Sequence, residues 1–421
     1  MVLKYWLTKE IEMADGKNCL KRSGLFCAII LAYVFLTPFL FDLVLWEAYS
    51  LTSSVRYCLW NYLPWLILVL GIVASFRGKM PDLKLLAAAV LVWLVYFAVN
   101  FANGLPTDRL VTVSHRTMIC LLGASVLLSD ESRAAIIFEA LDCLYIVTVI
   151  MIIVFKTIPA VSVALLGWEY DALLSSDNGT TWPLLFGALY AMLDHYYNGA
   201  RARPAIYGFL LVAAEYFLWC ATAMVGVAII AVCLLPFIRR PLLNLKSEAI
   251  AVASVLLAAF FVFFFEKLCT LQPIRFLTDN VLKKDVSLTG RTIIWAGIRP
   301  LAVAKPLFGH GLVVPAFFMD EVYNHTTVHA HNFFLQAFYE GGLACIAAGI
   351  VMMLYCCRKV RKKNDKHLVF FLNVISIAML VMLQSDQPAY WSWYPVMMLY
   401  GIMALLPPKN NGQLPAEGTA E

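Results

Sequence analysis

Runs of about twenty apolar residues recur along this chain, and they constrain its fold more than any other feature. Of its 421 residues, 62% are hydrophobic and only 14% are charged, whereas about 25% of a soluble domain is charged. Each helix that crosses a hydrocarbon core about 30 Å thick needs roughly 20 apolar residues. The chain is therefore expected to be an all-α, polytopic membrane helical bundle. Twelve candidate spans lie near 24–46, 59–76, 85–103, 110–128, 134–155, 182–194, 205–221, 222–238, 249–265, 332–356, 368–384 and 394–407.

Lysine and arginine set the expected orientation, because they accumulate in cytoplasmic loops. With the N-terminus inside, most of them fall on the cytoplasmic side, including six within 358–366. These loops account for the net charge of +5, so no nucleic-acid partner is expected. The expected parts are a cytoplasmic N-terminus (1–23) before an uncleaved first helix, a bundle of about nine helices (24–265), a large outer loop with short helices (266–331), about three C-terminal spans (332–407) and a cytoplasmic tail (408–421).

A histidine motif closes the outer loop. His329 and His331 lie two residues apart, and Asn332 opens the next span. A neutral imidazole can accept a proton from a hydroxyl at neutral pH, so this pair is a candidate for acid–base catalysis. The alternative is that both histidines are interfacial polar residues and that Asn332 is a helix N-cap. His310 and His325 are weaker candidates, expected to be solvated loop residues.

Basic residues precede this motif on a segment with a helical apolar pattern. Arg291 and Arg299 lie eight residues apart, which places them roughly on one face of a helix over 291–303. Guanidinium groups bind phosphate oxygens in a bidentate manner, so both are candidates for binding a diphosphate, and Lys305 adds a point charge. The alternative is a basic amphipathic helix that rests on anionic headgroups. Pro306 is expected to end this helix.

Other candidates lie within or between the spans. Arg116 falls inside the fourth span, where a charge is costly unless it is functional, and snorkelling to the outer interface is the alternative. In the last outer loop, Asp386 could bind a sugar hydroxyl, and Trp391 and Trp393 could stack on sugar rings; an aromatic belt is the alternative. Glu340 lies within the tenth span, close to the histidine motif. No cysteine–histidine spacing indicates a metal site.

Four short motifs resemble the O-antigen ligase and polymerase superfamily of bacterial inner-membrane glycosyltransferases of the GT-C type. They are Thr289-Gly290-Arg291-Thr292-Ile293-Ile294-Trp295, Pro306-Leu307-Phe308-Gly309-His310-Gly311, His329-Ala330-His331-Asn332 and Glu340-Gly341-Gly342-Leu343. The resemblance implies transfer of a glycan from undecaprenyl diphosphate to a hydroxyl at the periplasmic face, with inversion and without a metal or another cofactor. By position, Arg291 would hold the diphosphate. His331, or else His329, would activate the acceptor, with Asn332 beside it.

The sequence departs from the family at one position. Members commonly carry a second arginine near the start of the 222–238 span, where this chain has Thr222 and no arginine within 220–226. Either another cation serves, with Arg116 as the first candidate, or the donor site is built differently.

Three functions are compared with these sequence features. An O-antigen ligase with lipid A–core as acceptor is the leading hypothesis. A Wzy-type polymerase of O-antigen, capsule or exopolysaccharide, which would extend a growing glycan chain, is the alternative. A lipid or polysaccharide transporter is disfavoured, because the spans carry few central ionisable residues and no paired interrupted helices.

Overall fold

The structure is a computed structural model, and all of its regular elements are helices within the residues that it describes. These are 81–128, 131–166, 181–199, 221–268, 271–276, 291–312, 329–384 and 393–409, with isolated positions at 62, 65, 69, 206, 208–210, 212–213 and 280. The helices are α5 (Leu83–Ala102), α6 (Asp108–Leu127), α7 (Glu131–Thr157), α8 (Pro159–Leu166), α9 (Thr181–Asn198), α11 (Ala221–Leu234), α12 (Pro236–Asn244), α13 (Ser247–Leu268), α14 (Gln272–Phe276), α15 (Arg291–Ala304), α17 (Phe333–Lys362), α18 (Lys366–Met382) and α19 (Tyr394–Leu405).

The expected spans fall on helices wherever the structure describes them, but the number of spans is not confirmed. By length and composition, α5 and α17 can each cross a membrane, and α11 with α12 makes a third if the pair is one broken span. The expected first span, 24–46, lies outside the described residues, as does most of 59–76. The helix expected over 291–303 is confirmed as α15.

The span expected over 222–238 is not one straight helix. The chain turns by 87° between α11 and α12. Leu235 adopts an extended conformation directly before Pro236, because proline disfavours the helical conformation of the residue that precedes it. The 14 residues of α11 extend only about 21 Å, which is short of the hydrocarbon thickness.

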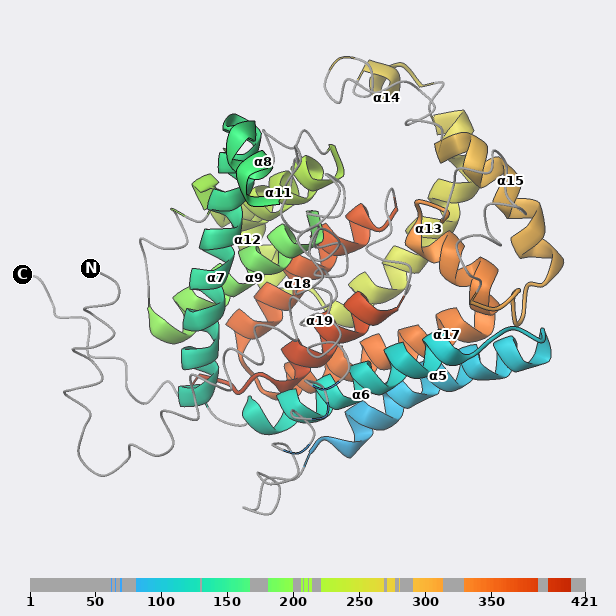
Figure 1. Cartoon of the computed structure of the whole chain (residues 1–421), viewed down its shortest axis with the longest axis horizontal. Coiled ribbons are helices and arrows are strands. Elements are labelled where there is room, and N and C mark those ends of the chain that lie inside the picture. The colour runs from blue at the N-terminus through green and yellow to red at the C-terminus, as the bar shows by residue number, and fades with distance from the viewer. Residues whose placement is uncertain are drawn as a thin grey trace, which may run out of the picture.

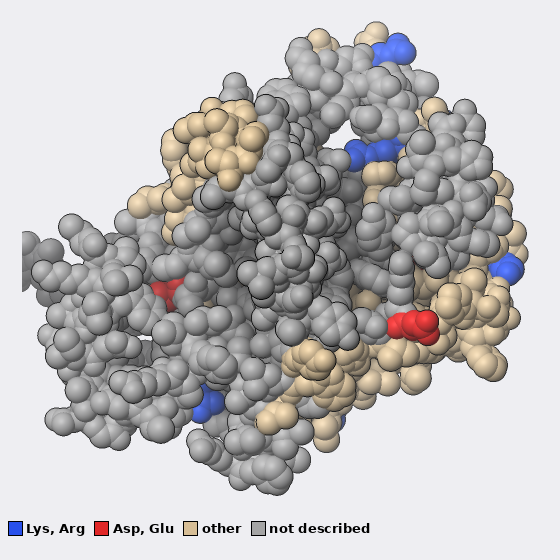
Figure 2. Space-filling view, viewed as in Figure 1, with Lys and Arg blue, Asp and Glu red and all other residues tan. Residues whose placement is uncertain are grey.

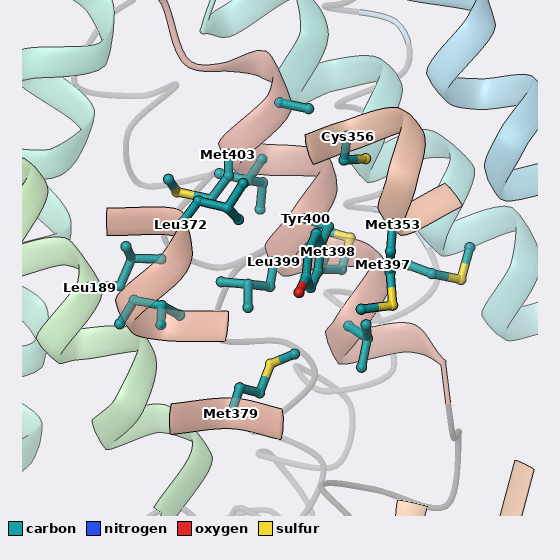
Figure 3. Close-up of a cluster of buried hydrophobic side chains, with 14 of the residues drawn as sticks. Leu189, Met353, Cys356, Leu372, Met379, Met397, Met398, Leu399, Tyr400 and Met403 are labelled. Carbon is teal, nitrogen blue, oxygen red and sulfur yellow. The ribbon is translucent and has the colours of Figure 1, made fainter. Parts of the chain in front are cut away.

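Helix α17 is the central element of the fold. It lies beside α5 along one side and packs against α13, α15 and α19 (Figure 1). Methionine, leucine and cysteine side chains from α9, α17, α18 and α19 meet in the core (Figure 3). A Cβ added at Gly349 would lie 2.2 Å from the ring of Trp393, so the indole reaches the axis of α17 only because that position has no side chain.

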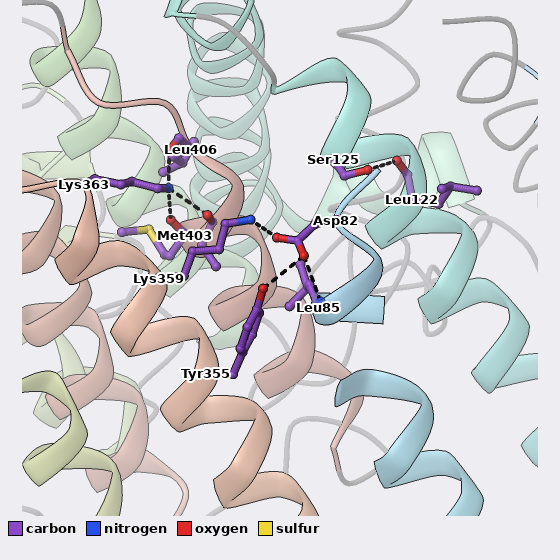
Figure 4. Close-up of polar contacts among 10 residues, drawn as sticks. Asp82, Leu85, Leu122, Ser125, Tyr355, Lys359, Lys363, Met403 and Leu406 are labelled. Atoms are coloured by element: carbon purple, nitrogen blue, oxygen red, sulfur yellow. Dashed lines mark hydrogen bonds and ion pairs between the residues drawn. The ribbon is translucent and has the colours of Figure 1, made fainter. Parts of the chain in front are cut away.

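Contacts at the helix ends sort into two groups. At one end, which we call the Asp82 end, Asp82 bonds with Lys359 and with the Tyr355 hydroxyl (Figure 4). Lys363 donates to the carbonyl of Ala404 at 2.7 Å and so caps α19 (Figure 4). At the other end, the Asn332 end, the backbone N–H of Phe333 donates to the carbonyl of Leu383 at 2.9 Å.

A break in α17 receives the loop that follows α15. Gly342 has a φ of +61°, which interrupts the helix. The carbonyls of Tyr339 and Glu340, which would otherwise accept within α17, accept from His310 and Gly311 at 2.8 and 2.7 Å. Beyond the break, the N–H groups of Leu343 and Ala344 donate to the carbonyls of Pro306 and Leu307 at 2.9 and 3.0 Å. The 306–311 loop therefore supplies backbone hydrogen bonds to groups of α17 that the break leaves without partners inside the helix.

Two glycines permit this insertion. A Cβ at Gly309 would lie 2.6 Å from the carbonyl oxygen of Tyr339, and one at Gly342 would lie 2.4 Å from the carbonyl carbon of Leu307. Both are contacts with backbone, which has little freedom to move. The motifs Gly309-His310-Gly311 and Glu340-Gly341-Gly342 thus form the two sides of this contact between the loop and α17, which we call the 306–311 junction.

We expect Gly309→Ala to destabilise the protein far more than Gly104→Ala. The two glycines have nearly the same φ, +67° and +65°, so alanine carries the same conformational strain of about 1–2 kcal/mol at both. Only at Gly309 does the new methyl group meet backbone, whereas no atom lies within 4 Å of it at Gly104. Thermal melting of the two purified variants in detergent tests this, and equal losses of stability would contradict the tight fit of the junction.

Candidate active site

The histidine motif is held in place through Ala330, which is fully buried. Its N–H donates to Oε1 of Gln336 at 2.8 Å, and its carbonyl accepts from Nε1 of Trp295 at 2.8 Å. Gln336 belongs to α17 and Trp295 to α15, so two helices fix the two peptide planes that flank Ala330. This double clamp positions His329 and His331 on either side of it.

Asn332 is the N-cap of α17. Its Oδ1 accepts from the N–H of Leu335 at 2.9 Å, and its Nδ2 donates to the carbonyl of Gln384 at 2.8 Å. The side chain is fully buried. These contacts agree with the alternative that Asn332 is a helix N-cap. They also connect the histidine motif to the residues that follow α18.

His329 and His331 form a close imidazole pair. Their ring centroids are 4.1 Å apart. The backbone N–H of His331 donates to Nδ1 of His329 at 3.2 Å, so that nitrogen is an acceptor and the proton of a neutral His329 ring lies on Nε2. His331 has a φ of +48°, a left-handed conformation that is unfavourable for a residue with a side chain. Such strain is typical of functional sites.

The surroundings of the pair keep His329 neutral. Burial, together with the charges of His331 and Arg291, lowers the pKa of His329 to about 3. A general base works best with a pKa near the working pH, so a pKa of about 3 makes His329 a poor base. The charge of Arg291, at the start of α15, therefore acts on His329.

Arg291 and Arg299 flank the clamp on α15. Each lies four residues from Trp295, and Nε of Arg299 donates to the carbonyl of Trp295 at 3.2 Å. Arg291 is the first residue of α15, the helix end whose dipole favours an anion. The buried face of α15 packs on α17, so this helix lies against protein and not solely on a headgroup layer. In the view of Figure 2, Lys and Arg atoms lie in the upper part of the molecule, where Figure 1 shows α14.

Two other candidates of the outer loop hold the fold together. Lys305 lies at the far end of α15 from Arg291 and donates to Oδ1 of Asn103 at 2.7 Å. His310 is half-buried, which corrects the expectation of a solvated loop residue. Its ring stacks on Tyr339 with centroids 4.8 Å apart, and its Nε2 lies 2.8 Å from the carbonyl oxygen of Leu301.

Arg116 is enclosed by protein. Its side chain is only 3% exposed, which does not fit snorkelling to a surface. It acts electrostatically on Cys120 one turn along α6, and the thiol of Cys120 hydrogen-bonds with Tyr394, the first residue of α19. Arg116 therefore lies toward the Asn332 end of the bundle. These interactions connect it to α19 and do not place it beside the histidine pair.

The aromatic loop is only partly described. Trp393 is 1% exposed and packs edge-on against Phe333, with ring centroids 5.0 Å apart. The structure thus corrects the prediction for Trp393, because a buried core side chain offers no face to a sugar ring. Asp386, Trp391 and His325 lie outside the described residues.

The sequence interpretation missed Gln336 and Tyr96. Nε2 of Gln336 donates to Oε1 of Glu340 at 2.7 Å, and the hydroxyl of Tyr96 donates to Oε2 of Glu340 at 3.3 Å. The available signal was the spacing of Gln336 and Glu340, two polar residues four apart in an apolar span, which share one helix face.

We expect the stability of the protein to fall between pH 7 and pH 5 partly because of His329. Its folded pKa of about 3 lies below the usual 6.5, so the unfolded chain binds the proton more tightly. The contribution of neutral His329 is complete above about pH 6.5 and declines as the pH falls toward 3, by about 2 kcal/mol at pH 5.

The control is His329→Asn, whose Oδ1 can still accept from the N–H of His331 but does not titrate in this range. Its melting temperature should fall less than that of the wild type over the same interval. An equal decrease in melting temperature in the variant and the wild type would show that His329 is not held neutral.

Comparison with protein families supports the resemblance. The model of the family described as O-Antigen ligase matches residues 206–348. This segment contains α11 to α15, the 306–311 loop, the histidine motif and the break in α17. A search of curated proteins finds no match. Residues 206–348 are therefore similar to the family described as O-Antigen ligase, which confirms the resemblance to the O-antigen ligase/Wzy-like superfamily.

Proposed function

We propose that this chain is a membrane glycosyltransferase that moves a glycan from undecaprenyl diphosphate to a hydroxyl acceptor. The observation that carries the proposal is the close, strained imidazole pair, on which the charge of Arg291 at the N-terminus of α15 acts. A proton acceptor and a phosphate-binding cation side by side are what glycosyl transfer from a lipid diphosphate requires. The family match supports the same class of chemistry.

Arg291 holds the diphosphate in this proposal. Its guanidinium and the first N–H groups of α15 stabilise the negative charge that grows on the leaving group. Arg299 and Arg116 are the further cations that we assign to the donor. Arg116 would replace the family arginine that is absent at Thr222, the second residue of α11.

His331 activates the acceptor. Its imidazole takes the proton of the acceptor hydroxyl while the oxygen attacks the anomeric carbon from the face opposite the diphosphate. The new bond joins the anomeric carbon to the acceptor oxygen. The bond from that carbon to the diphosphate oxygen breaks, and undecaprenyl diphosphate leaves with the electron pair. The configuration at the anomeric carbon is inverted, and the family resemblance implies no metal or other cofactor.

The Asn332 end is proposed to face the periplasm from a bacterial inner membrane. The opposite end carries a dense group of basic residues, as cytoplasmic ends do. Arg361 pairs there with Glu248 at 2.8 Å, and the N–H of Lys409 donates to the Tyr196 hydroxyl at 2.9 Å. The basic residues at or near this end are Arg239, Arg240, Lys246, Arg358, Lys359, Arg361, Lys362, Lys363, Lys366 and Lys409.

The acceptor that we propose is a hydroxyl of lipid A–core, which makes the enzyme an O-antigen ligase. A Wzy-type polymerase uses the same donor chemistry and differs in its acceptor, the growing glycan chain. A deletion strain examined by lipopolysaccharide gel separates the two. Loss of polymer from lipid A–core, with polymer retained on undecaprenyl diphosphate, supports the ligase, whereas a single repeat unit on lipid A–core identifies a polymerase.

We expect Arg291→Lys to lower transfer about 10- to 100-fold. Lysine keeps the charge but loses the bidentate geometry that suits a diphosphate. Lys305→Arg is the matched control, because it also exchanges one basic residue of the same segment for another but lies at the far end of α15. Initial rates with purified protein in liposomes measure the effect. Unchanged activity in Arg291→Lys would contradict diphosphate binding by this residue.

A further inference from the structure

We infer that Gln336 and Glu340 are positioning residues that set the geometry of the His329–His331 pair, an inference that rests on the proposed function. The side-chain amide of Gln336 bonds to the backbone of Ala330 and to Glu340, and Glu340 bonds in turn to Tyr96. The two residues therefore act on the imidazoles through the backbone of Ala330.

The chain of hydrogen bonds has one direction. The Tyr96 hydroxyl donates to Oε2 of Glu340, Nε2 of Gln336 donates to Oε1 of Glu340, and the N–H of Ala330 donates to Oε1 of Gln336. Glu340, as a carboxylate, only accepts, so it fixes which end of the Gln336 amide faces it. The carbonyl oxygen of that amide must then face Ala330. If the amide of Gln336 were flipped, its Oε1 would face Oε1 of Glu340, and its Nε2 would face the N–H of Ala330. Two acceptors and two donors would then oppose each other.

This orientation reaches the histidines through the two successive peptides that flank Ala330. Gln336 holds the peptide between His329 and Ala330, and Trp295 holds the next peptide at its carbonyl. The N–H of that second peptide is the group that donates to Nδ1 of His329. Its plane therefore determines both the tautomer of His329 and the left-handed backbone of His331.

Burial of the three side chains makes the loss of any hydrogen bond in this network costly in free energy. Tyr96, Gln336 and Glu340 are 1%, 3% and 2% exposed. A buried polar group that loses its partner costs about 1–3 kcal/mol, so the network has one favourable pattern of donors and acceptors. Glu340 also lies at the break in α17, where its carbonyl accepts from Gly311. The network thus connects the 306–311 junction to the histidine motif.

Exchanging the two side chains tests the inference. Gln336→Glu alone places two carboxylates together and should lower kcat about 10- to 100-fold, the scale expected when a reacting group is displaced by about 1 Å. The double variant Gln336→Glu with Glu340→Gln restores the order, because the carboxylate at position 336 accepts from Ala330 and the amide at position 340 donates to that carboxylate. It should recover most of kcat, with the KM for the donor nearly unchanged in all variants.

Asn373→Leu is the matched control for loss of a buried amide. Asn373 is fully buried at the Asp82 end and donates to the carbonyls of Leu242 and Leu245 at 2.9 and 3.0 Å. It should lose stability as Gln336→Leu does but keep kcat. Equal losses of kcat in the two leucine variants, or no recovery in the exchanged double variant, would overturn the positioning role.

A readout that does not depend on activity separates this inference from the proposed function. Diethyl pyrocarbonate modifies imidazole nitrogens, and mass spectrometry follows the reaction at His329 and His331 individually. Gln336→Leu should change their relative rates severalfold, whereas Asn373→Leu should not. If the wild type transfers no glycan but the rates change as expected, the positioning role stands and the proposed reaction fails. Unchanged rates would contradict the positioning role.

Discussion

The hydrogen bonds between the 306–311 loop and the broken helix α17 are the constraint on which the site depends. A helix interrupted inside an apolar bundle leaves backbone carbonyl and N–H groups that cannot bond with water. Each such group without a partner costs about 1–3 kcal/mol of stability. Here the loop supplies partners on both sides of Gly342. The insertion anchors the C-terminal end of α15 to α17, and the bond between Trp295 and Ala330 ties α15 to the histidine motif that precedes α17.

This construction separates the residues that hold the site from those proposed to act in it. Gly309 and Gly342 allow the backbones of the 306–311 loop and of α17 to meet. Asn332 begins the helix, and Gln336 and Trp295 fix the turn before it. The imidazoles and Arg291 are then left at the edge of a rigid frame. Rigid supporting elements are what a positioned acid–base pair needs.

Apolar periodicity was enough to place helices at the expected spans that the structure describes, because each run of about twenty residues has few alternatives in a membrane. It did not show that the 222–238 run bends at Leu235 or that α17 breaks at Gly342, since both depend on single Pro and Gly residues whose effect is set by the tertiary surroundings. The described part of the chain likewise leaves the twelve-span count unconfirmed.

The candidate site was predicted in part. The motif spacing marked Arg291, His329 and His331. The structure pairs the two histidine rings, and the charge of Arg291 acts on His329. Trp393 was a candidate for sugar stacking or for an aromatic belt although it is a core residue, because aromatic composition alone does not distinguish an interface from a packed interior. Gln336 and Tyr96 were missed because their partners lie across a turn and on another helix, respectively, and no local pattern reveals such contacts.

The most direct test of the account compares the two histidines in purified protein reconstituted into liposomes with a lipid-diphosphate glycan donor and a lipid A–core acceptor. Asparagine is substituted at each position in turn, since it tolerates the left-handed backbone at His331 and keeps an acceptor at His329. His331→Asn should lower transfer by about 100-fold or more, the usual scale of general-base catalysis, while His329→Asn should retain most of it. Transfer at the wild-type rate in folded His331→Asn would contradict the central claim.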